Sequence, residues 1–272
     1  VTRQFTRPSL FEKDCPHYVP PHRRHLQAAQ RAQRRGDSVA VEKHLRQALD
    51  AAPRYTAAHA ALARRRLARG AASAVRTQLD TLSVTEQSVG LRLLLGDALA
   101  ITGAPASARR QYRDARVRTP RYAHDTRTRL LLRGVVADRP DVVAALVSGA
   151  SPSDQSRQLA ALDGAQTPAV EAWRALRLQE AHRYASADSL WRRVDTTPDP
   201  DWPRAWRTAW MIQRLDWHSA AAYRAGGEEA LGRALRLARS SSEQAAAHGA
   251  RGWAEVLAER ARQAKRALTD RP

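Results

Sequence analysis

The sequence predicts an all-α protein, built as a superhelix of antiparallel helix pairs. Three glycines, Gly36, Gly70 and Gly103, stand 34 and 33 residues apart, each between two segments with helical patterning. Pro53 and Pro120 stand 67 residues apart, the same distance as the first and third glycines. A fixed period of this size is typical of helical repeat arrays, and a composition rich in Ala, Leu and Arg favours helix throughout.

The expected elements follow this register. Residues 1–21 contain four prolines and no sustained periodicity, so we expect an extended N-terminal arm. Helix pairs are expected over 22–55, 56–84 and 88–122. In each pair a glycine ends the first helix in a left-handed conformation, and Pro53 stops the second helix of the first pair.

Small residues recur where two helices must approach closely: Ala29, Ala63 and Gly96 are again 34 and 33 residues apart. The third unit adds further positions of the same register, namely Leu95, Leu99, Ala108, Tyr112 and Ala115. This set resembles the tetratricopeptide repeat (TPR) family over residues 22–121, although the second unit lacks the closing proline. The resemblance implies a right-handed solenoid whose first helices line a concave peptide-binding groove.

Beyond residue 121 the period is less regular. We expect a shortened pair at 121–147, a connector rich in Ser, Pro and Gly at 149–156, and another pair at 167–194. Further helices follow, ending in a long one from about Ser242 to Leu268. The organisation predicted is therefore TPR-like repeats over 22–150 and divergent, Trp-rich helical repeats over 151–272, which continue or cap the solenoid.

The charge is strongly basic and unevenly placed. The net charge is +19, of which residues 1–136 carry +16 and residues 137–272 carry +3. Of the 46 basic residues 43 are arginine, a bias that a GC-rich genome can partly explain, whereas the asymmetry between the halves is harder to explain in that way. A basic N-terminal half is expected to attract acidic protein segments, phosphates or nucleic acid.

The resemblance places five residues on the groove wall: Arg23, Gln30, Arg34, Arg64 and Asp97. Arginine forks pair bidentately with carboxylates and phosphates, so this wall would suit an acidic or extended segment of a partner protein. The alternative interpretation is a solvated helix face. The family's clamp for a C-terminal carboxylate uses Lys and Asn at groove positions, and this chain has neither there, so that ligand is not expected.

Two other surfaces are weaker candidates. Six arginines between Arg109 and Arg121 lie on an expected second helix and would be needed for nucleic-acid binding, but no recognised nucleic-acid motif accompanies them. All seven tryptophans follow residue 172, and Trp202, Trp206 and Trp210 recur every four residues as one helix stripe. That stripe is either an aromatic groove for a ligand or part of the core, and core packing is the preferred interpretation.

Neither a metal nor a cofactor is expected. Cys15, His17, His22 and His25 are close in sequence, but their spacing matches no standard zinc pattern. Enzyme signatures are absent, and the neighbours Asp216, His218 and Ser219 are unlike a triad, which assembles from separate elements. A single cysteine fits a reducing compartment, so a cytoplasmic location is favoured, with a periplasmic or secreted one left open by a removable signal peptide. No apolar run reaches the roughly 18 residues of a membrane span.

The function predicted is therefore a non-catalytic protein-interaction scaffold or adaptor. Its partner would be a protein or peptide, acidic or extended in character, held in the basic groove. Two alternatives stay open, a nucleic-acid-binding helical-repeat protein and an accessory domain of a larger enzyme or regulator. The oligomeric state is not predicted.

Overall fold

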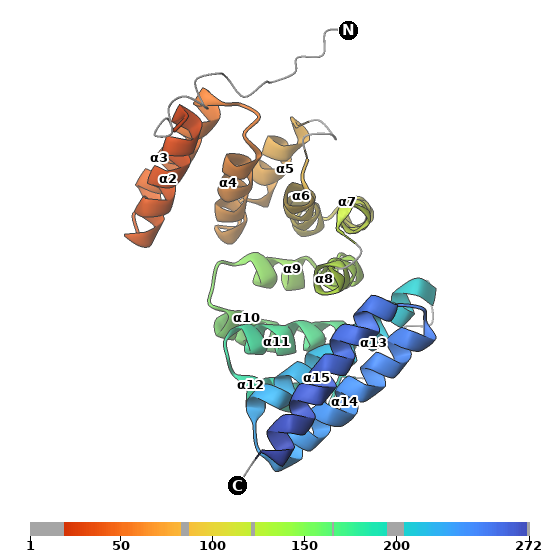
Figure 1. The fold of residues 1–272 in the computed structure, drawn as a ribbon. Coiled ribbons are helices and arrows are strands. Elements are labelled where there is room, and N and C mark those ends of the chain that lie inside the picture. Colours follow the sequence, from red (N-terminus) through yellow and green to blue (C-terminus); the bar gives the residue numbers. More distant parts are fainter. Residues whose placement is uncertain (1–18, 83–86, 121–122, 165, 195–203, 271–272) are drawn as a thin grey trace.

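The chain is an all-α superhelix of helices packed against their neighbours in sequence (Figure 1). The computed structural model describes residues 19–82, 87–120, 123–164, 166–194 and 204–270, and over them it contains fourteen helices and no strand. The N-terminal helices lie at one end of the array and the last three at the other. None of the described helices is long and apolar enough to cross a membrane.

The first half of the array is made of α2 (Pro21–Arg34), α3 (Ser38–Ala51), α4 (Thr56–Ala68), α5 (Ala72–Asp80), α6 (Val89–Ile101), α7 (Pro105–Arg118), α8 (His124–Val135) and α9 (Pro140–Val147). The second half is made of α10 (Pro152–Ala160), α11 (Pro168–Glu180), α12 (Tyr184–Trp191), α13 (Arg204–Ala225), α14 (Glu228–Ala247) and α15 (Arg251–Thr269).

The three periodic glycines end the first helix of each N-terminal pair, as the sequence predicts. Gly36, Gly70 and Gly103 have φ angles of 74°, 76° and 78°, which an L side chain rarely adopts. After each glycine the next amide donates to a carbonyl five residues earlier, at 2.8 to 3.0 Å. This is the Schellman motif, which satisfies carbonyls at the helix end. Three similar turns therefore set the spacing of the three pairs.

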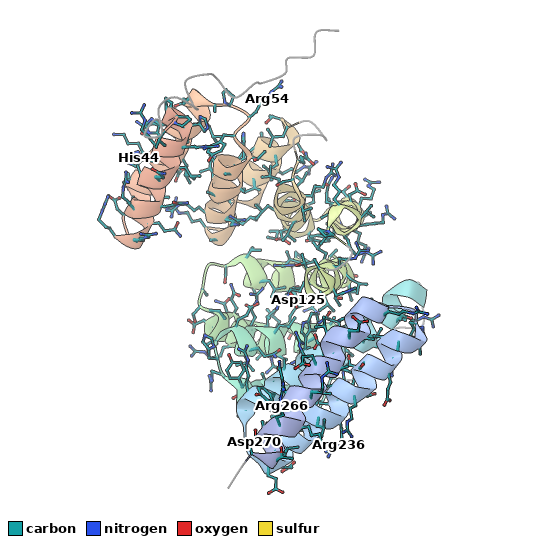
Figure 2. All side chains as sticks on the ribbon, viewed as in Figure 1. His44, Arg54, Asp125, Arg236, Arg266 and Asp270 are labelled. Atoms are coloured by element: carbon teal, nitrogen blue, oxygen red, sulfur yellow. The ribbon has the colours of Figure 1, made fainter. Side chains whose placement is uncertain are left out.

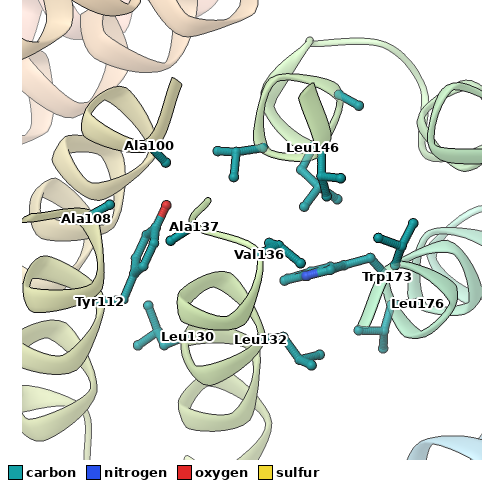
Figure 3. Packing of buried hydrophobic residues seen from close by; sticks show 14 of the residues in the cluster. Ala100, Ala108, Tyr112, Leu130, Leu132, Val136, Ala137, Leu146, Trp173 and Leu176 are labelled. Carbon is teal, nitrogen blue, oxygen red and sulfur yellow. The ribbon is translucent and has the colours of Figure 1, made fainter. Parts of the chain in front are cut away.

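The small residues of the register are packing positions. Ala29 and Ala63 are buried. At Gly96 of α6 an added Cβ would lie only 2.6 Å from Cε1 of Tyr112, which belongs to α7. The absence of a side chain at Gly96 therefore lets α6 and α7 approach closely, with the Tyr112 ring between them and Leu130 of α8 beside it (Figure 3).

The regular stacking changes at α8 and α9. Both helices form where the sequence predicts a shortened pair, but their principal contacts are with other helices. The helix α8 packs against α7 and α13, whereas α9 packs across α4 and α6. Val142, Val143 and Leu146 of α9 are buried in one cluster with Leu67 of α4. Because α9 contacts the first helices of pairs two and three, it covers much of the face that the resemblance assigns to a ligand groove.

The core is continuous across the expected boundary near residue 150. One cluster of buried apolar side chains runs from Ala63 to Ala221. The helix α10 begins at Pro152, inside the expected connector, and the hydroxyl of Ser151 caps it by accepting from the amide of Asp154. The chain therefore changes character near residue 150 in composition, but its packing continues.

The last helices differ in their limits from the prediction. The helix α14 runs through Ser242, and the expected single final helix is instead divided at Gly249, which has a φ of 74°. Ser242 lies inside α14, and its hydroxyl donates to the carbonyl of Ala254 on α15, at 2.9 Å. The neighbouring Ser241 hydroxyl donates to Ile212 on α13, at 2.8 Å. The two serines of α14 therefore bond it to its neighbours, Ser241 to α13 and Ser242 to α15.

Candidate partner-binding surface

Four of the five predicted groove residues are exposed. Arg23, Gln30 and Arg34 lie on α2, and Arg64 lies on α4. No described side chain forms a hydrogen bond or an ion pair with the guanidinium groups of these three arginines, which we call the α2–α4 arginines. They are therefore available to a partner, on the first helices of the first two pairs.

Their surroundings are strongly basic. Residues 19–82 contain thirteen arginines and lysines but only four aspartates and glutamates. Glu42 is already paired with Arg46 at 2.7 Å and with Arg69 at 2.8 Å. Asp37 is used as the cap of α3, where its side chain accepts from the amide of Ala40. Asp80 is paired with Arg76 at 3.6 Å, so three of the four carboxylates in residues 19–82 are engaged locally. None of the four forms an ion pair with the α2–α4 arginines.

The fifth predicted groove residue, Asp97, is not on the surface, and the expectation for it is wrong. Its side chain is 2% exposed. The Tyr112 hydroxyl donates to Asp97 Oδ1 at 2.9 Å, and a guanidinium nitrogen of Arg133 lies 3.5 Å from the same oxygen. Burial raises the pKa of Asp97 above its ordinary value, while Arg133 and the Tyr112 hydroxyl oppose that rise. Asp97 therefore joins α6, α7 and α8 and cannot meet a partner.

The first-helix face, to which the resemblance assigns a groove, is consequently less open than the resemblance implies. The helix α9 lies over α4 and α6, and Gly149 just after it would place a Cβ 2.9 Å from that of Ala68. Repeat arrays bind partners on the surfaces that their stacking leaves open. Here the open part of the first-helix face is α2 and the exposed side of α4, which carries Arg64.

The arginines of the second basic cluster are largely used within the protein. Arg109 on α7 pairs with Asp138 at 3.2 Å and donates to the carbonyl of Gly134. Arg118 donates to the carbonyl of Gln87 at 3.3 Å, and Arg110 donates to the hydroxyl of Ser107. Arg121 lies outside the described residues. This cluster is therefore less available to a polyanion than the α2–α4 arginines are.

The tryptophan stripe does not form a described groove. Trp210 is 2% exposed and belongs to the main core cluster, so core packing is confirmed at that position. Trp202 and the side chain of Trp206 lie outside the described residues. Trp173 is also buried, packed by Val136 and Leu176 (Figure 3).

Arginines cover the face of Trp173. The guanidinium carbons of Arg133 and Arg177 lie 5.0 and 5.5 Å from its ring centroid. Cation–π contacts of this kind stabilise a buried guanidinium. Arg133 and Arg177 belong to α8 and α11, so the ring of Trp173 helps to join these two helices.

A buried polar network, which the sequence analysis did not detect, joins the last helices. Asp188 on α12 accepts from Arg233 on α14 and lies 3.0 Å from Nε2 of His218 on α13. Burial alone would raise the pKa of Asp188, but hydrogen bonds from His218, Arg233 and Arg192 outweigh it and hold that pKa far below its usual range. No short-range pattern marks these residues, because they come from three separate helices.

The neighbours Asp216, His218 and Ser219 do not act together. Asp216 pairs with Arg260 and accepts from Gln213, His218 binds Asp188, and the Ser219 hydroxyl donates to the carbonyl of Ala234. Each therefore has its own partner on a different side of α13. A nucleophile–base–acid relay would need bonds among them.

The histidines near the N-terminus also have separate surroundings. His22 meets the ring of Tyr55 edge-on at 4.7 Å between centroids, and His25 stacks on His44 at 6.1 Å. Cys15 and His17 lie outside the described residues. Within the described ranges, no group of three or more metal-ligating side chains comes together.

Comparisons with known proteins give no family assignment. No protein-family model matches the chain, and no curated protein matches it.

Proposed function

We propose that this chain is a non-catalytic, TPR-like protein-interaction scaffold, whose α2–α4 arginines bind an acidic, extended segment of a partner protein. The observation that carries the proposal is that Arg23, Arg34 and Arg64 are exposed and have no carboxylate partner among the described residues, in a region where three of the four acidic groups are already engaged. In the later part of the array, arginines such as Arg129, Arg139 and Arg233 are paired with carboxylates of the same chain.

The mechanism is recognition by preformed helices. Because α2 and α4 are already helical and packed in stacked pairs, little conformational entropy would be lost in their backbone when a partner binds. Exposed guanidinium groups contribute orientation and association rate, and each contributes modestly to affinity because water and salt screen it. We therefore expect the affinity to fall with increasing ionic strength, since the Debye length shrinks from about 10 Å at 0.1 M to about 3 Å at 1 M.

A nucleic-acid partner is the alternative. Two of the α7 arginines, which would be its main contact, are engaged within the protein: Arg109 with Asp138 and Gly134, and Arg118 with the carbonyl of Gln87. Nucleic acid also requires groups that read or stack on bases, and no described aromatic side chain accompanies Arg23, Arg34 and Arg64 through a cation–π contact. These observations favour the protein partner.

The test is a pull-down from a lysate of the source organism, with and without nuclease, analysed by mass spectrometry. The test variant is Arg23→Glu/Arg34→Glu/Arg64→Glu. The matched control, Arg110→Glu/Arg113→Glu/Arg236→Glu, makes the same change in net charge at exposed arginines that form no ion pair among the described residues. We expect protein bands that persist with nuclease and with the control variant, but that are lost with the test variant.

Three outcomes would contradict the proposal. Bands that vanish on nuclease treatment would indicate nucleic acid. Equal loss with both variants would indicate a general charge effect. Equal retention with both would place the binding surface elsewhere on the array.

A further inference from the structure

The outward face of α2 carries arginine and glutamine almost exclusively. The helix packs against α3 at the N-terminal end of the array, where Ala29 and Ala32 are buried with Val41 and Leu45 (Figure 1). It contains no aspartate or glutamate. Apart from Pro21 at its start, its exposed side chains are those of Arg23, Arg24, Gln27, Gln30, Arg31, Gln33 and Arg34. The outward face of α2 is therefore basic and has no carboxylate of its own.

Other helices of this chain that carry several arginines use guanidinium groups within the protein. On α4, Arg65 donates to the carbonyl of Ser38 at 3.1 Å, and on α15, Arg262 pairs with Glu259 at 2.7 Å. On α2, by contrast, no guanidinium group forms a hydrogen bond or an ion pair with a described residue. All the guanidinium groups of α2 are thus open to an external acceptor.

Three exposed arginines gather at the C-terminal end of α2. Arg31 precedes Arg34 by three residues and Arg35 by four, spacings at which side chains share one side of a helix with Cβ atoms about 5–6 Å apart. Arg35 is the C-cap residue and keeps right-handed helical angles, with φ −87° and ψ −1°. We call these three residues the α2 end cluster. Long side chains at these positions can bring three guanidinium groups to one point above the helix, where like charges repel and an anion relieves the repulsion.

No carboxylate of the described residues forms an ion pair with the α2 end cluster. Asp37 is the nearest in sequence, but its side chain caps α3 by accepting from the amide of Ala40 at 2.9 Å. Glu42 on α3 is paired with Arg46 and Arg69. The acceptors for the three guanidinium groups are therefore water molecules or groups of a partner.

The chemistry of the α2 end cluster favours a phosphate group over a single carboxylate. A carboxylate carries one negative charge on two oxygens, which one bidentate arginine fork already occupies. A phosphorylated serine or threonine carries a charge of about −1.5 to −2 at pH 7 and three strong acceptor oxygens. Three guanidinium groups within about one helical turn therefore match one phosphate in both charge and number of acceptors.

We infer that the α2 end cluster binds a phosphorylated serine or threonine in the acidic segment of the partner protein. The inference rests on the proposed function, because the same segment meets the α2–α4 arginines. Phosphorylation of the partner then strengthens its binding to this scaffold. A membrane surface fits less well, since apart from Pro21 the exposed side of α2 has no apolar side chain to insert. Nucleic acid also fits less well, since this side exposes no aromatic ring on which bases could stack.

The first test measures binding of the full chain to three labelled peptides by fluorescence anisotropy, at low salt so that screening is weak. The probe is Glu-Gly-Ser-Gly-Glu with its serine phosphorylated. The comparison peptides are the unphosphorylated form and Glu-Glu-Glu-Gly-Glu, which is close to the phosphopeptide in net charge. We expect the phosphopeptide to bind at least about tenfold more tightly than either.

Two results of this titration overturn the inference. One is equal affinity for the phosphopeptide and the charge-matched peptide, and the other is no binding of the phosphopeptide at about 1 mM. Neither result decides the proposed function, which the pull-down tests separately. Unlabelled RNA hexanucleotide and vesicles that contain phosphatidic acid are added as competitors. Stronger competition from either than from unlabelled phosphopeptide, at equal phosphate concentration, also overturns the inference.

The second test uses variants that leave the α2–α4 arginines in place. Arg31→Gln/Arg35→Gln removes two of the three guanidinium groups at exposed positions, with a residue that favours helix. The matched control is Arg236→Gln/Arg239→Gln, an exposed pair on α14. Arg236 lies at the opposite end of the array from His44 of α3 (Figure 2).

We expect the preference for the phosphopeptide to disappear in the test variant and to persist in the control. If the double variant does not fold, Arg31→Gln alone replaces it, because Arg31 takes part in both close spacings of the α2 end cluster. A preference that persists in the folded test variant, or that disappears in both variants, overturns the inference.

Discussion

The ring of Tyr112 occupies the space that Gly96 leaves open on the neighbouring helix, with 2.6 Å between its Cε1 and the position of a Cβ on that glycine. Tyr112 is 1% exposed, and its hydroxyl is fixed by the bond to Asp97. The ring therefore has little freedom to move away. This contact sets the distance between α6 and α7, in the unit whose sequence carries the repeat pattern best.

Replacing Gly96 by alanine should destabilise the protein. The added methyl group meets the Tyr112 ring, and overpacking of a close-packed core costs about 1–3 kcal/mol. The measurement is urea unfolding followed by circular dichroism. The control is Gly134→Ala within α8, where an added Cβ meets nothing within 4 Å and better helix propensity should stabilise by up to about 1 kcal/mol. Equal effects of the two substitutions would contradict the close approach of Gly96 and Tyr112.

A second prediction concerns His182, which ends α11 with a φ of 58°. It makes the same turn as Gly36, Gly70 and Gly103, since the amide of Arg183 donates to the carbonyl of Leu178 at 2.8 Å. A left-handed residue other than glycine is strained by about 1 kcal/mol or more. His182→Gly should therefore raise the melting temperature, despite losing the bond between the imidazole and Tyr184.

The reciprocal substitution, Gly103→Ala, should lower the melting temperature by a similar amount, because its φ is 78°. The melting temperatures of the His182→Gly and Gly103→Ala variants are measured by differential scanning calorimetry and compared with that of the wild type. A destabilised His182→Gly variant would mean that the bond from His182 to Tyr184 outweighs the backbone strain.

The third prediction is a loss of stability on mild acidification. Burial lowers the pKa of His218 below its ordinary value of 6.5, although Asp188 opposes this. The Asp188 carboxylate accepts from Nε2 of His218, so a further proton would have to bind at Nδ1 of His218. This Nδ1 is buried and has no hydrogen-bond partner among the described residues. As pH falls below 6.5 the unfolded chain takes up a proton that the folded chain does not, so the free energy of unfolding decreases, at most by about 1.4 kcal/mol per pH unit for this one proton.

Urea unfolding at pH 7.5, 6.5 and 5.5 tests this prediction by comparing the wild type with His218→Gln, which keeps a donor for Asp188. The pH dependence should be smaller in the variant, and the remaining dependence includes His124, whose pKa is also lowered. Parallel pH curves for the two proteins would show that His218 does not titrate differently on unfolding.

The fourth prediction concerns the position of α9. Leu146 is 4% exposed in the core shared with α4 and α6. Leu146→Ala should cost about 2–5 kcal/mol and should speed hydrogen exchange in α4 and α6 as well as in α9 itself. The control, Ala144→Ser, changes an exposed position of the same helix. If exchange in α4 and α6 stayed at the wild-type rate, α9 would not be the cover of their shared face.

Local chemistry made the helices predictable. Gly36, Gly70 and Gly103 could be placed because a left-handed helix end depends on one residue and its neighbours. The burial of Ala29 and Ala63 followed from their register. The division at Gly249 was missed because Ser242, Glu243 and Gln244 look like a helix start, whereas the serine is bonded to α15.

The candidate sites were less predictable. Arg23, Arg34 and Arg64 are exposed as expected, since no segment among the described residues covers them. Asp97 was assigned to the groove from its register alone, yet its environment is set by Tyr112 and Arg133, which follow it by 15 and 36 residues in the chain. The cleft between the start of α8, α13 and the turn that joins α14 to α15 had no sequence signal, because its walls come from residues 123–125 and from residues 213–260.

The sequence by itself therefore determined the helical class, the period and the turns, because these depend on interactions within a few residues. Only the tertiary structure decided that α9 crosses α4 and α6, that Asp97 is buried and that His218 and Arg233 meet at Asp188. Periodicity indicates which face of a helix is apolar, but it does not specify which distant helix will cover that face. That choice depends on the packing of the whole chain.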